Sequence, residues 1–286
     1  MLTVSAAQLK AYRAKTYRLR PALKLKSTAE AVKFVNQRGF VYFWPIKGVE
    51  LPSLWVAVAG NRPVADAHDD PGHVTWRWKD SMLGARQWHY AKLLRGKATI
   101  VSLKTLPYFY ALSENYGDRE QDYLQQYAEG RLTQEAKVIF ETLLHKGALD
   151  TVTLRREARM TSPESNARFE RALTELQTGL KILPIGVAEA GAWRYAFIYE
   201  LVDRYFPDLA EQARDIGRAE ARAHLIDLYL RSVGAATEKQ IAQLFHWKPD
   251  EVARGVAGLL GRRKARRAET VGGESRSWVI TKALGR

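Results

Sequence analysis

Two carboxylates lie in a part of the chain that is unusually rich in aromatic residues. Glu50 and Asp80 precede residue 100, as do five of the eight tryptophans. A carboxyl group that is walled by aromatic rings loses hydration, which suits it to general acid or base catalysis or to orienting a water molecule. Glu50 and Asp80 are therefore the candidate catalytic residues.

The aromatic side chains near these carboxylates have two interpretations. They could form a pocket in which an unstacked nucleic-acid base lies flat. They could equally fill the core of a small domain, because large aromatic side chains bury much apolar area. Under the first interpretation the base pocket consists of Tyr42, Trp44, Trp55, Trp76 and Trp78.

Other common site chemistries are poorly supported. A loop rich in acids and histidines lacks the ligand spacing of zinc or calcium motifs, and its Pro71-Gly72 pair is typical of a solvated turn; the loop holds Asp66, His68, Asp69, Asp70 and His73. The sequence contains no phosphate-cradling glycine loop and no nucleophile elbow. We expect no bound metal and no cofactor.

Basic charge is large and clustered. The chain of 286 residues has 45 Lys and Arg against 31 Asp and Glu, a net charge of +14, which favours binding of a polyanion. Residues 10–26 contain seven basic and no acidic side chains, and Arg262 to Arg267 hold five basic side chains. A basic enzyme from an Arg-using genome is the alternative, but the clustering favours nucleic acid. Such binding requires these cations to lie along one continuous face.

The cations expected to contact DNA come from these clusters, from predicted hairpin turns and from predicted helices. They are Lys10, Arg13, Lys15, Arg18, Arg20, Lys24, Lys26, Lys79, Arg86, Lys92, Arg95, Lys97, Arg168, Arg171, Lys248, Arg254, Arg262, Arg263, Lys264, Arg266 and Arg267. Most would contact phosphates, whereas Arg168, Arg171, Lys248 and Arg254 could reach base edges from a helix.

Composition limits the classes of protein to which the chain can belong. The hydrophobic fraction of 46% is typical of a globular chain, and no stretch approaches the roughly 18 apolar residues that a membrane span needs. The chain has no cysteine and begins without an apolar signal core, which fits a reducing cytoplasm. We expect a cytoplasmic, nucleoid-associated protein that does not bind membranes, and a monomer is favoured.

One pattern of elements recurs along the chain: a long helix, a short helix and another helix, followed by two strands around a Gly-containing turn. In the C-terminal copy the predicted helices are 218–233, 237–245 and 248–260, and the strands are 268–271 and 277–280 around Gly272-Gly273. The middle copy has helices 133–144, 151–159 and 162–177 and strands 180–187 and 193–199. The first copy has helices 4–18, 28–37 and 53–59 and strands 88–94 and 98–102.

Two segments fall outside this pattern. Residues 61–86 form an insert that exceeds ordinary loop length and is expected to carry function. Residues 106–127 are expected to form a linking helical stretch. Three helices followed by a hairpin are typical of a winged helix, which binds DNA through its third helix and its hairpin, although winged helices also bind proteins.

The predicted fold class is therefore α+β, mainly helical, with three tandem winged-helix domains. Residues 1–117 hold the first domain with its aromatic-rich insert. Residues 118–207 hold the linker helix and the second domain, and residues 208–286 hold the third.

The chain resembles the tandem winged-helix family of crosslink-repair DNA glycosylases. The resemblance is carried by residues 38–44 (RGFVYFW), 51–55 (LPSLW) and 76–102, and it extends over the three repeats. It implies three winged helices around duplex DNA, damaged or intact, and excision of alkylated or crosslinked bases. The family's catalytic motif is Gln-apolar-Gln or Gln-apolar-Asp, and its side chains position the hydrolytic water. Tyr42, Phe43 and Trp44 occupy those places here.

Neither Tyr42 nor Trp44 can serve as a carboxylate-like base, because a phenol titrates near ~10 and an indole only donates. Our first hypothesis is a DNA-binding protein without the family's hydrolysis. The second is a glycosylase that relies on Glu50 or Asp80 instead. The third is a transcription regulator that senses a ligand in the aromatic pocket.

Overall fold

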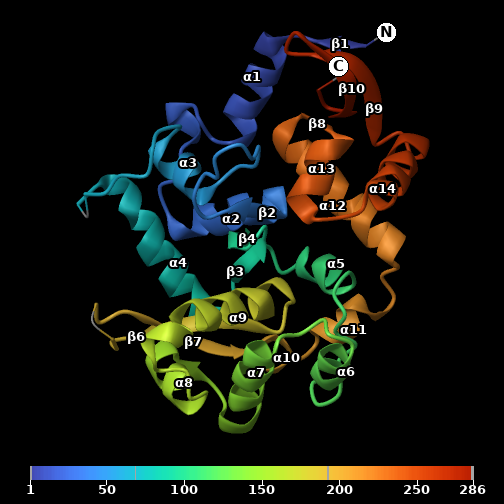
Figure 1. The fold of residues 1–286 in the computed structure, drawn as a ribbon. Coiled ribbons are helices and arrows are strands. Elements are labelled where there is room, and N and C mark those ends of the chain that lie inside the picture. The colour runs from blue at the N-terminus through green and yellow to red at the C-terminus, as the bar shows by residue number, and fades with distance from the viewer. Residues whose placement is uncertain (1, 68, 192, 285–286) are drawn as a thin grey trace.

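The computed structural model describes residues 2–67, 69–191 and 193–284 as an α+β chain in which helix predominates over three small sheets (Figure 1). Three units share one order of elements: helix, strand, helix, helix and a two-stranded hairpin. We call them the first, second and third units. They comprise residues 28–101, 134–201 and 218–281.

The first unit consists of α2 (Thr28–Arg38), β2 (Phe40–Tyr42), α3 (Leu54–Ala59), α4 (Val74–Gly84), β3 (His89–Leu94) and β4 (Lys97–Val101). The second consists of α7 (Gln134–Lys146), β5 (Leu149–Asp150), α8 (Thr151–Glu157), α9 (Asn166–Thr178), β6 (Ile182–Ala188) and β7 (Ala196–Leu201). The third consists of α12 (Arg218–Val233), β8 (Ala235–Thr237), α13 (Glu238–Phe245), α14 (Pro249–Gly261), β9 (Ala265–Val271) and β10 (Glu274–Thr281).

The remaining elements connect or brace the units. They are β1 (Thr3–Val4), α1 (Ala6–Thr16), α5 (Leu106–Tyr110), α6 (Asp122–Ala128), α10 (Val202–Tyr205), α11 (Leu209–Arg214) and the 3₁₀ turns Pro21–Leu23, Pro71–His73 and Pro163–Ser165. Each unit places its last strand in the middle of its sheet, in the orders β2-β4-β3, β5-β7-β6 and β8-β10-β9. β1 adds to the third sheet, parallel to β9, with Thr3 opposite Thr270. The N-terminus is thereby fixed to the C-terminal unit.

Local sequence explains several helix boundaries. Ser53 accepts a hydrogen bond from the Val56 N–H and caps α3, and Thr237 forms a capping box with Gln240 at the start of α13. α12 ends at Gly234, whose φ of 85° favours glycine. The helices predicted at 28–37, 53–59, 218–233 and 237–245 are present within about a residue at each end.

Two expectations about linking segments were wrong. Residues 106–127 do not form one helical stretch, because the chain turns at Gly117, whose φ is 93°. The Asp122 carboxylate accepts hydrogen bonds from the N–H groups of Tyr116 and Gly117, at 2.6 and 3.2 Å, and thus stabilises this turn. The third helix of the first unit is α4, in the second half of the insert 61–86, and not the helix 53–59 as expected, which is the unit's second helix.

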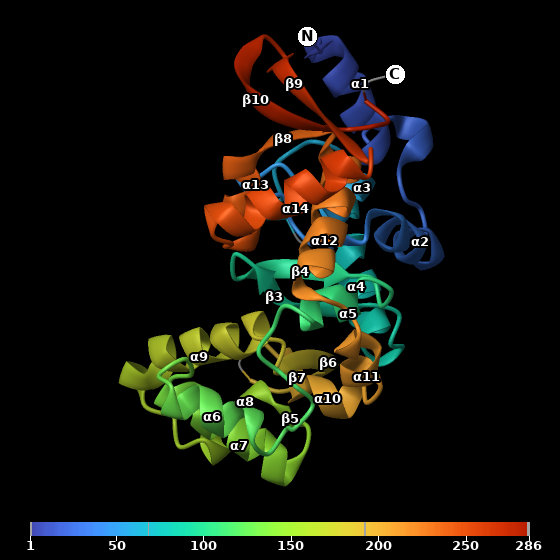
Figure 2. The same ribbon diagram turned by 90° about the vertical axis from the view of Figure 1, so that its right-hand side faces the viewer.

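The largest core joins the first and third units. Phe40 packs edge-on against Phe109 and Phe245, with ring centroids 5.5 and 5.8 Å apart, and α12 contributes Leu225 and Tyr229 to the same cluster. The second unit has its own core around Phe140, Phe169 and Leu173. In Figures 1 and 2 the third unit and α1 lie at one end of the molecule and the second unit lies at the other. None of the helices in the described ranges combines the length and apolar character that crossing a bilayer requires.

Candidate nucleic-acid interface

A cleft of about 800 Å³ lies where the first and third units meet α1. Lys10 and Arg13 of α1 form one wall, residues 45–51 form a second, and Gln240 and Gly272 of the third unit close it. Figures 1 and 2 show α1 beside the β9–β10 hairpin, as the pairing of β1 with β9 requires. The cleft therefore combines parts of the chain that are more than 200 residues apart.

Glu50 is held in this cleft by two donors. Arg13 pairs with the Glu50 carboxylate at 2.9 Å, and the Tyr17 hydroxyl donates a hydrogen bond to Oε2 at 3.3 Å. Burial raises the pKa of Tyr17 well above its usual value, so this phenol remains a donor at neutral pH. The side chain of Glu50 is 47% exposed. The carboxylate thus faces the cleft as a fixed acceptor with room for water or substrate.

The second candidate carboxylate belongs to a different place. Asp80 pairs with Lys79 at 2.8 Å and accepts a hydrogen bond from the Tyr195 hydroxyl at 3.0 Å. Tyr195 comes from the hairpin of the second unit, whereas Lys79 and Asp80 lie on α4 of the first. Glu50 and Asp80 therefore share no partner in these contacts and do not form one acid–base pair.

The expectation that five aromatic side chains wall one open pocket was wrong. Tyr42 and Trp55 are completely buried and Trp78 is 6% exposed, so these three fill the core. Trp44 is half-buried and bridges the buried Trp55 to Trp76, at ring-centroid distances of 5.4 and 5.6 Å. Trp76 is 37% exposed. Trp44 is tilted by 51° against Trp55 and meets Trp76 edge-on, so these three rings pack on one another instead of walling a pocket.

Lys79 was wrongly expected to contact DNA, since its side chain is completely buried. The spacing of α4 explains the burial. Thr75, Lys79 and Leu83 are four residues apart, so they lie on one face of the helix, and all three are buried. The charge of Lys79 is satisfied inside the protein by Asp80 and Tyr195.

Most cations of the predicted N-terminal cluster reach solvent. Lys10, Lys15, Arg20 and Lys26 are exposed, and the remaining three make contacts within the protein. Arg18 donates to Gln37, Lys24 donates to the Ala59 carbonyl, and Arg13 holds Glu50. At the same end of the molecule, the third unit exposes Lys248, Arg254, Arg262, Arg263, Lys264, Arg266 and Arg267.

Arg254 and Arg267 of the third unit have acidic neighbours. Arg254 pairs with Asp250 at 2.8 Å, and Arg267 pairs with Glu238 at 2.5 Å. Both arginines remain exposed. Because exposed ion pairs are weak, each guanidinium can exchange its carboxylate for a phosphate.

The second unit uses part of its third helix for contacts with the first unit. The Lys92 N–H on β3 donates to Gln177 on α9 at 3.0 Å, and Thr178 donates to the Lys92 carbonyl at 2.9 Å. A Cβ added to Gly96, at the β3–β4 turn, would lie 3.2 Å from Thr174 of α9. This turn therefore rests on α9.

The predicted cations around this junction remain at its margin. Arg95, Lys97, Arg168 and Arg171 are exposed, and Lys92 approaches Glu170 at 3.4 Å. Arg86 is exposed but stacks over the Tyr205 ring at 4.5 Å. This second group of cations lies on the first hairpin and the second unit, away from α1 (Figure 2). The outer face of α9 is thus only partly accessible to a groove of DNA.

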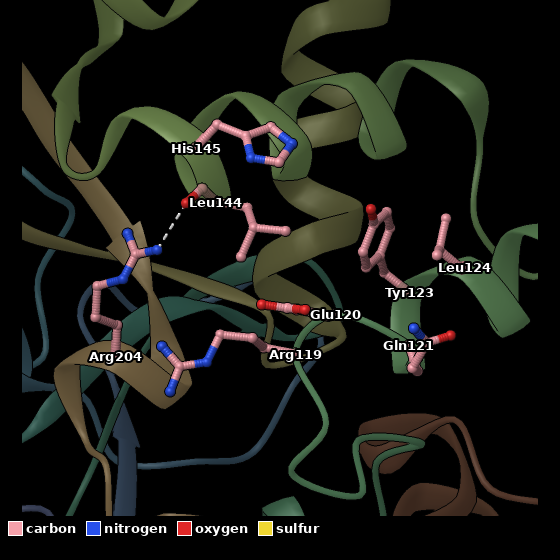
Figure 3. Close-up of a pocket in the computed structure, with 8 residues that line it drawn as sticks. All are labelled: Arg119, Glu120, Gln121, Tyr123, Leu124, Leu144, His145 and Arg204. Carbon is pink, nitrogen blue, oxygen red and sulfur yellow. Dashed lines mark hydrogen bonds between the residues drawn. The ribbon is translucent and has the colours of Figure 1, made fainter.

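A second cavity, of about 480 Å³, lies in the second unit between α6 and the end of α7 (Figure 3). Arg204 and Arg119 lie side by side there, and His145 faces them from α7. Arg204 donates to the carbonyls of Leu143 and Leu144, at 3.0 and 2.9 Å, and to Glu200. Its guanidinium thus caps the end of α7, so the cavity is a less favourable anion site than its two arginines indicate.

The loop with acids and histidines is organised by its own side chains. Asp70 pairs with Arg62 at 2.5 Å and accepts the Gly72 N–H at 2.7 Å, and His73 bonds to the Ala65 carbonyl. His68 lies outside the described residues. Within the described ranges, no group of three or more His, Cys, Asp and Glu side chains is placed to hold a metal ion.

Sequence reasoning missed Tyr17, Tyr195 and Gln240. Tyr17 lies within the basic cluster, and its spacing of four residues from Arg13 places both side chains on one side of α1. Tyr195 and Gln240 reach the first unit and the cleft from distant parts of the chain. Local sequence carries no signal for such contacts.

Comparisons with known proteins give a family match and a structural likeness. The sequence model of the family described as AlkZ related matches residues 25–246. The structure of the DNA glycosylase AlkZ from Streptomyces sahachiroi superimposes with a TM-score of 0.61 at 15% identity, covering 99% of this chain and 71% of that one. This likeness shows a common fold. No curated protein sequence matches the chain. The chain belongs to the AlkZ-related family.

Proposed function

We propose that this protein binds double-stranded DNA through three tandem winged-helix units, and that phosphate contacts dominate the affinity. The shared order of helix, strand, helix, helix and hairpin supports the assignment of each unit as a winged helix. The structurally similar AlkZ is named a DNA glycosylase, which supports DNA as the ligand. The domains proposed from the sequence, 1–117, 118–207 and 208–286, each contain one unit.

The observation that carries this proposal is that exposed cations gather on α1 and on the third unit, at the same end of the molecule. Lys10 and Lys15 of α1 are exposed at the end of the molecule where Arg262, Arg263 and Lys264 are exposed on the third unit. A net charge of +14 adds a long-range attraction to phosphate. One duplex backbone can follow α1 and the third unit together, because β1 pairs with β9 and keeps them adjacent.

The third unit offers the more open third helix for base contacts. α9 is partly covered by β3, and the end of α4 is held by the Tyr205 hydroxyl, which donates to the Leu83 carbonyl at 2.5 Å. On α14, Arg254 is exposed, and nothing lies within 4 Å of a Cβ built on Gly258. Base contacts therefore come from Arg254 and Lys248 more readily than from Arg168 and Arg171.

Fluorescence anisotropy with a labelled duplex at several salt concentrations tests the proposal. The logarithm of the association constant should fall linearly with the logarithm of salt concentration, by about 0.9 per phosphate contacted. An affinity that does not change with salt, or the absence of binding at low salt, would contradict it. Arg254→Ala should then reduce the difference in affinity between duplexes of different sequence. Arg168→Ala should leave that difference in affinity unchanged.

Base excision is the second candidate, and the position of Glu50 favours it. A half-exposed carboxylate in a cleft can stabilise the positive charge that develops on the sugar as the glycosidic bond breaks. It can also accept a proton from the attacking water. The family's water-positioning motif is not reproduced, since Tyr42 is completely buried and its hydroxyl has no partner.

Alkylated or crosslinked duplex, incubated with the protein and then cleaved by hot alkali, tests this second candidate. Strand breaks that disappear with Glu50→Gln would support it, and Asp80→Asn reports on the other carboxylate. Intact strands with the unaltered protein would exclude it and leave binding as the function.

A further inference from the structure

The helix α6 exposes apolar side chains to solvent, although two of its polar side chains are buried. Asp122 and Gln126 point inward, because the Asp122 carboxylate holds the preceding turn and the Gln126 amide donates to the Glu114 carbonyl at 2.6 Å. Leu124 and Tyr127 of the same helix are 37% and 39% exposed. A helix that packs only within its own protein normally turns its apolar side chains inward. The outer face of α6 therefore has the composition of a contact surface.

The cavity between α6 and the end of α7 adjoins this face (Figure 3). Leu124 of α6 and Leu144 of α7 supply apolar parts of its lining, together with the ring of Tyr123. Its volume of about 480 Å³ lies within the range of sites that hold small ligands, roughly 300–1,000 Å³. The cavity can therefore receive an apolar side chain together with a polar group that is attached to it.

The polar part of the lining contains a guanidinium that is not engaged within the protein. Arg204 donates to two carbonyls of α7 and pairs with Glu200 at 2.9 Å, so its charge is already balanced. Arg119 lies beside Arg204 in Figure 3. Within the described ranges, neither Arg119 nor the side chain of Gln121 makes an ion pair or a hydrogen bond. The cavity thus presents an unpaired cation and an unpaired amide next to apolar side chains.

Acidic side chains around the cavity restrict the kind of anion that fits. Glu120 belongs to the lining, and Asp118 and Glu129 are exposed on the adjoining turns of the chain. These carboxylates repel the many phosphates of a nucleic acid and also a run of acidic side chains. A single carboxylate can approach Arg119 alone and form a charge-assisted hydrogen bond with it. The favoured ligand therefore has one carboxylate and an apolar group.

We propose that this cavity binds the C-terminus of a partner protein whose last residue is apolar. The terminal carboxylate contacts Arg119, and the last side chain packs against Leu124 and Leu144. A chain end carries both groups on one Cα, and the Gln121 amide can bond to its last peptide group. Capture of a terminal carboxylate is a recurring mode of peptide recognition. The site lies at the opposite end of the molecule from α1, so a partner and a duplex can bind together (Figure 1).

Fluorescence anisotropy with the full chain tests this inference. The probe is an N-terminally labelled peptide of alternating Gly and Ser that ends in Leu with a free carboxyl group. Because this peptide has no charged side chain, the net charge of +14 does not attract it to other surfaces through acidic residues. We expect saturable binding that is weakened roughly tenfold or more when the carboxyl group is amidated. A peptide that ends in Ser should lose affinity as well.

Substitutions assign the binding to the cavity. Arg119→Gln should weaken binding of the free acid roughly tenfold and make the acid and the amide bind alike. Leu124→Ala should weaken binding but keep the preference for the acid. Arg214→Gln is the matched control, since Arg214 is an exposed arginine of α11 outside the cavity lining. Denaturant midpoints establish that each variant is folded.

Three results would overturn the inference. They are the absence of saturable binding by the unaltered protein, equal binding of acid and amide, and stronger binding of an amidated peptide that carries Asp before its Leu. Saturating duplex should leave the peptide bound, and its displacement by duplex would assign the cavity to DNA instead. Peptide binding by a protein that binds no duplex would count against the proposed function alone.

Discussion

Arg13 joins Glu50 to the end of α12. Its Nε donates to the Val233 carbonyl at 2.9 Å, and the other side of the guanidinium pairs with the Glu50 carboxylate at 2.9 Å. A single side chain of α1 thereby fixes the first unit against the third. The cleft between them owes its shape to this bridge as well as to the pairing of β1 with β9.

Replacement of Glu50 by Gln should strengthen duplex binding. The change removes a negative charge from the cleft, while the amide oxygen can still accept from Tyr17. The cost in stability should be within about 1 kcal/mol, because the ion pair with Arg13 is half-exposed. Anisotropy measures the affinity, and Glu189→Gln on the second hairpin is the matched control. Weaker binding by Glu50→Gln would show instead that the charge is needed to order the cleft.

Neutralising the α1 lysines should reduce the salt dependence of binding. Lys10 and Lys15 are exposed, so Lys10→Gln with Lys15→Gln should lower the slope of log K against log salt by about 2 if both contact phosphate. Lys146→Gln is the control, since Lys146 lies on α7 at the other end of the molecule (Figure 1). Equal slopes for the three proteins would remove α1 from the interface.

Helix boundaries could be predicted from the sequence where neighbouring residues alone determine them. Ser53 before α3 and Gly234 after α12 mark helix ends because capping and positive φ depend only on neighbouring residues. α4 was missed because the Pro71-Gly72 pair was interpreted as a solvated turn, whereas Asp70 caps a 3₁₀ turn that leads into the helix. No side chain caps it, and it continues directly from the turn Pro71–His73.

Whether a charged residue is buried or exposed could not be predicted from its residue type. Lys79 and Lys10 look alike in a sequence, yet one is buried beneath Tyr195 and the other is exposed. Tyr195 is 116 residues from Lys79, so no local pattern connects them. The same holds for Glu50, because its exposure depends on how α1 and α13 border the cleft.

His89 should make the protein less stable in mild acid. Its ring is completely buried, both nitrogens lack partners, and burial lowers its pKa to about 3. In the unfolded chain His89 binds a proton with a pKa near 6.5, whereas in the folded chain it stays neutral to lower pH. The free energy of unfolding therefore falls as the pH drops from 6.5 towards 3. At pH 5 this effect is about 2 kcal/mol. His89→Leu should flatten the pH dependence of denaturant midpoints over that range. An unchanged profile would show that His89 is protonated in the folded protein.

Two glycines should respond in opposite directions to alanine. A Cβ on Gly72 would lie 2.7 Å from the Trp55 ring, which is completely buried and contacts Trp44 and His73, so it has no room to move. Gly72→Ala should cost about 1–3 kcal/mol of unfolding free energy as an overpacked site. Gly258 lies within α14 with nothing inside 4 Å of its Cβ. Gly258→Ala should therefore stabilise the protein by about 0.5–1 kcal/mol through helix propensity. Urea denaturation of both variants measures the difference, and a neutral Gly72→Ala would mean that the aromatic cluster is looser than its contacts indicate.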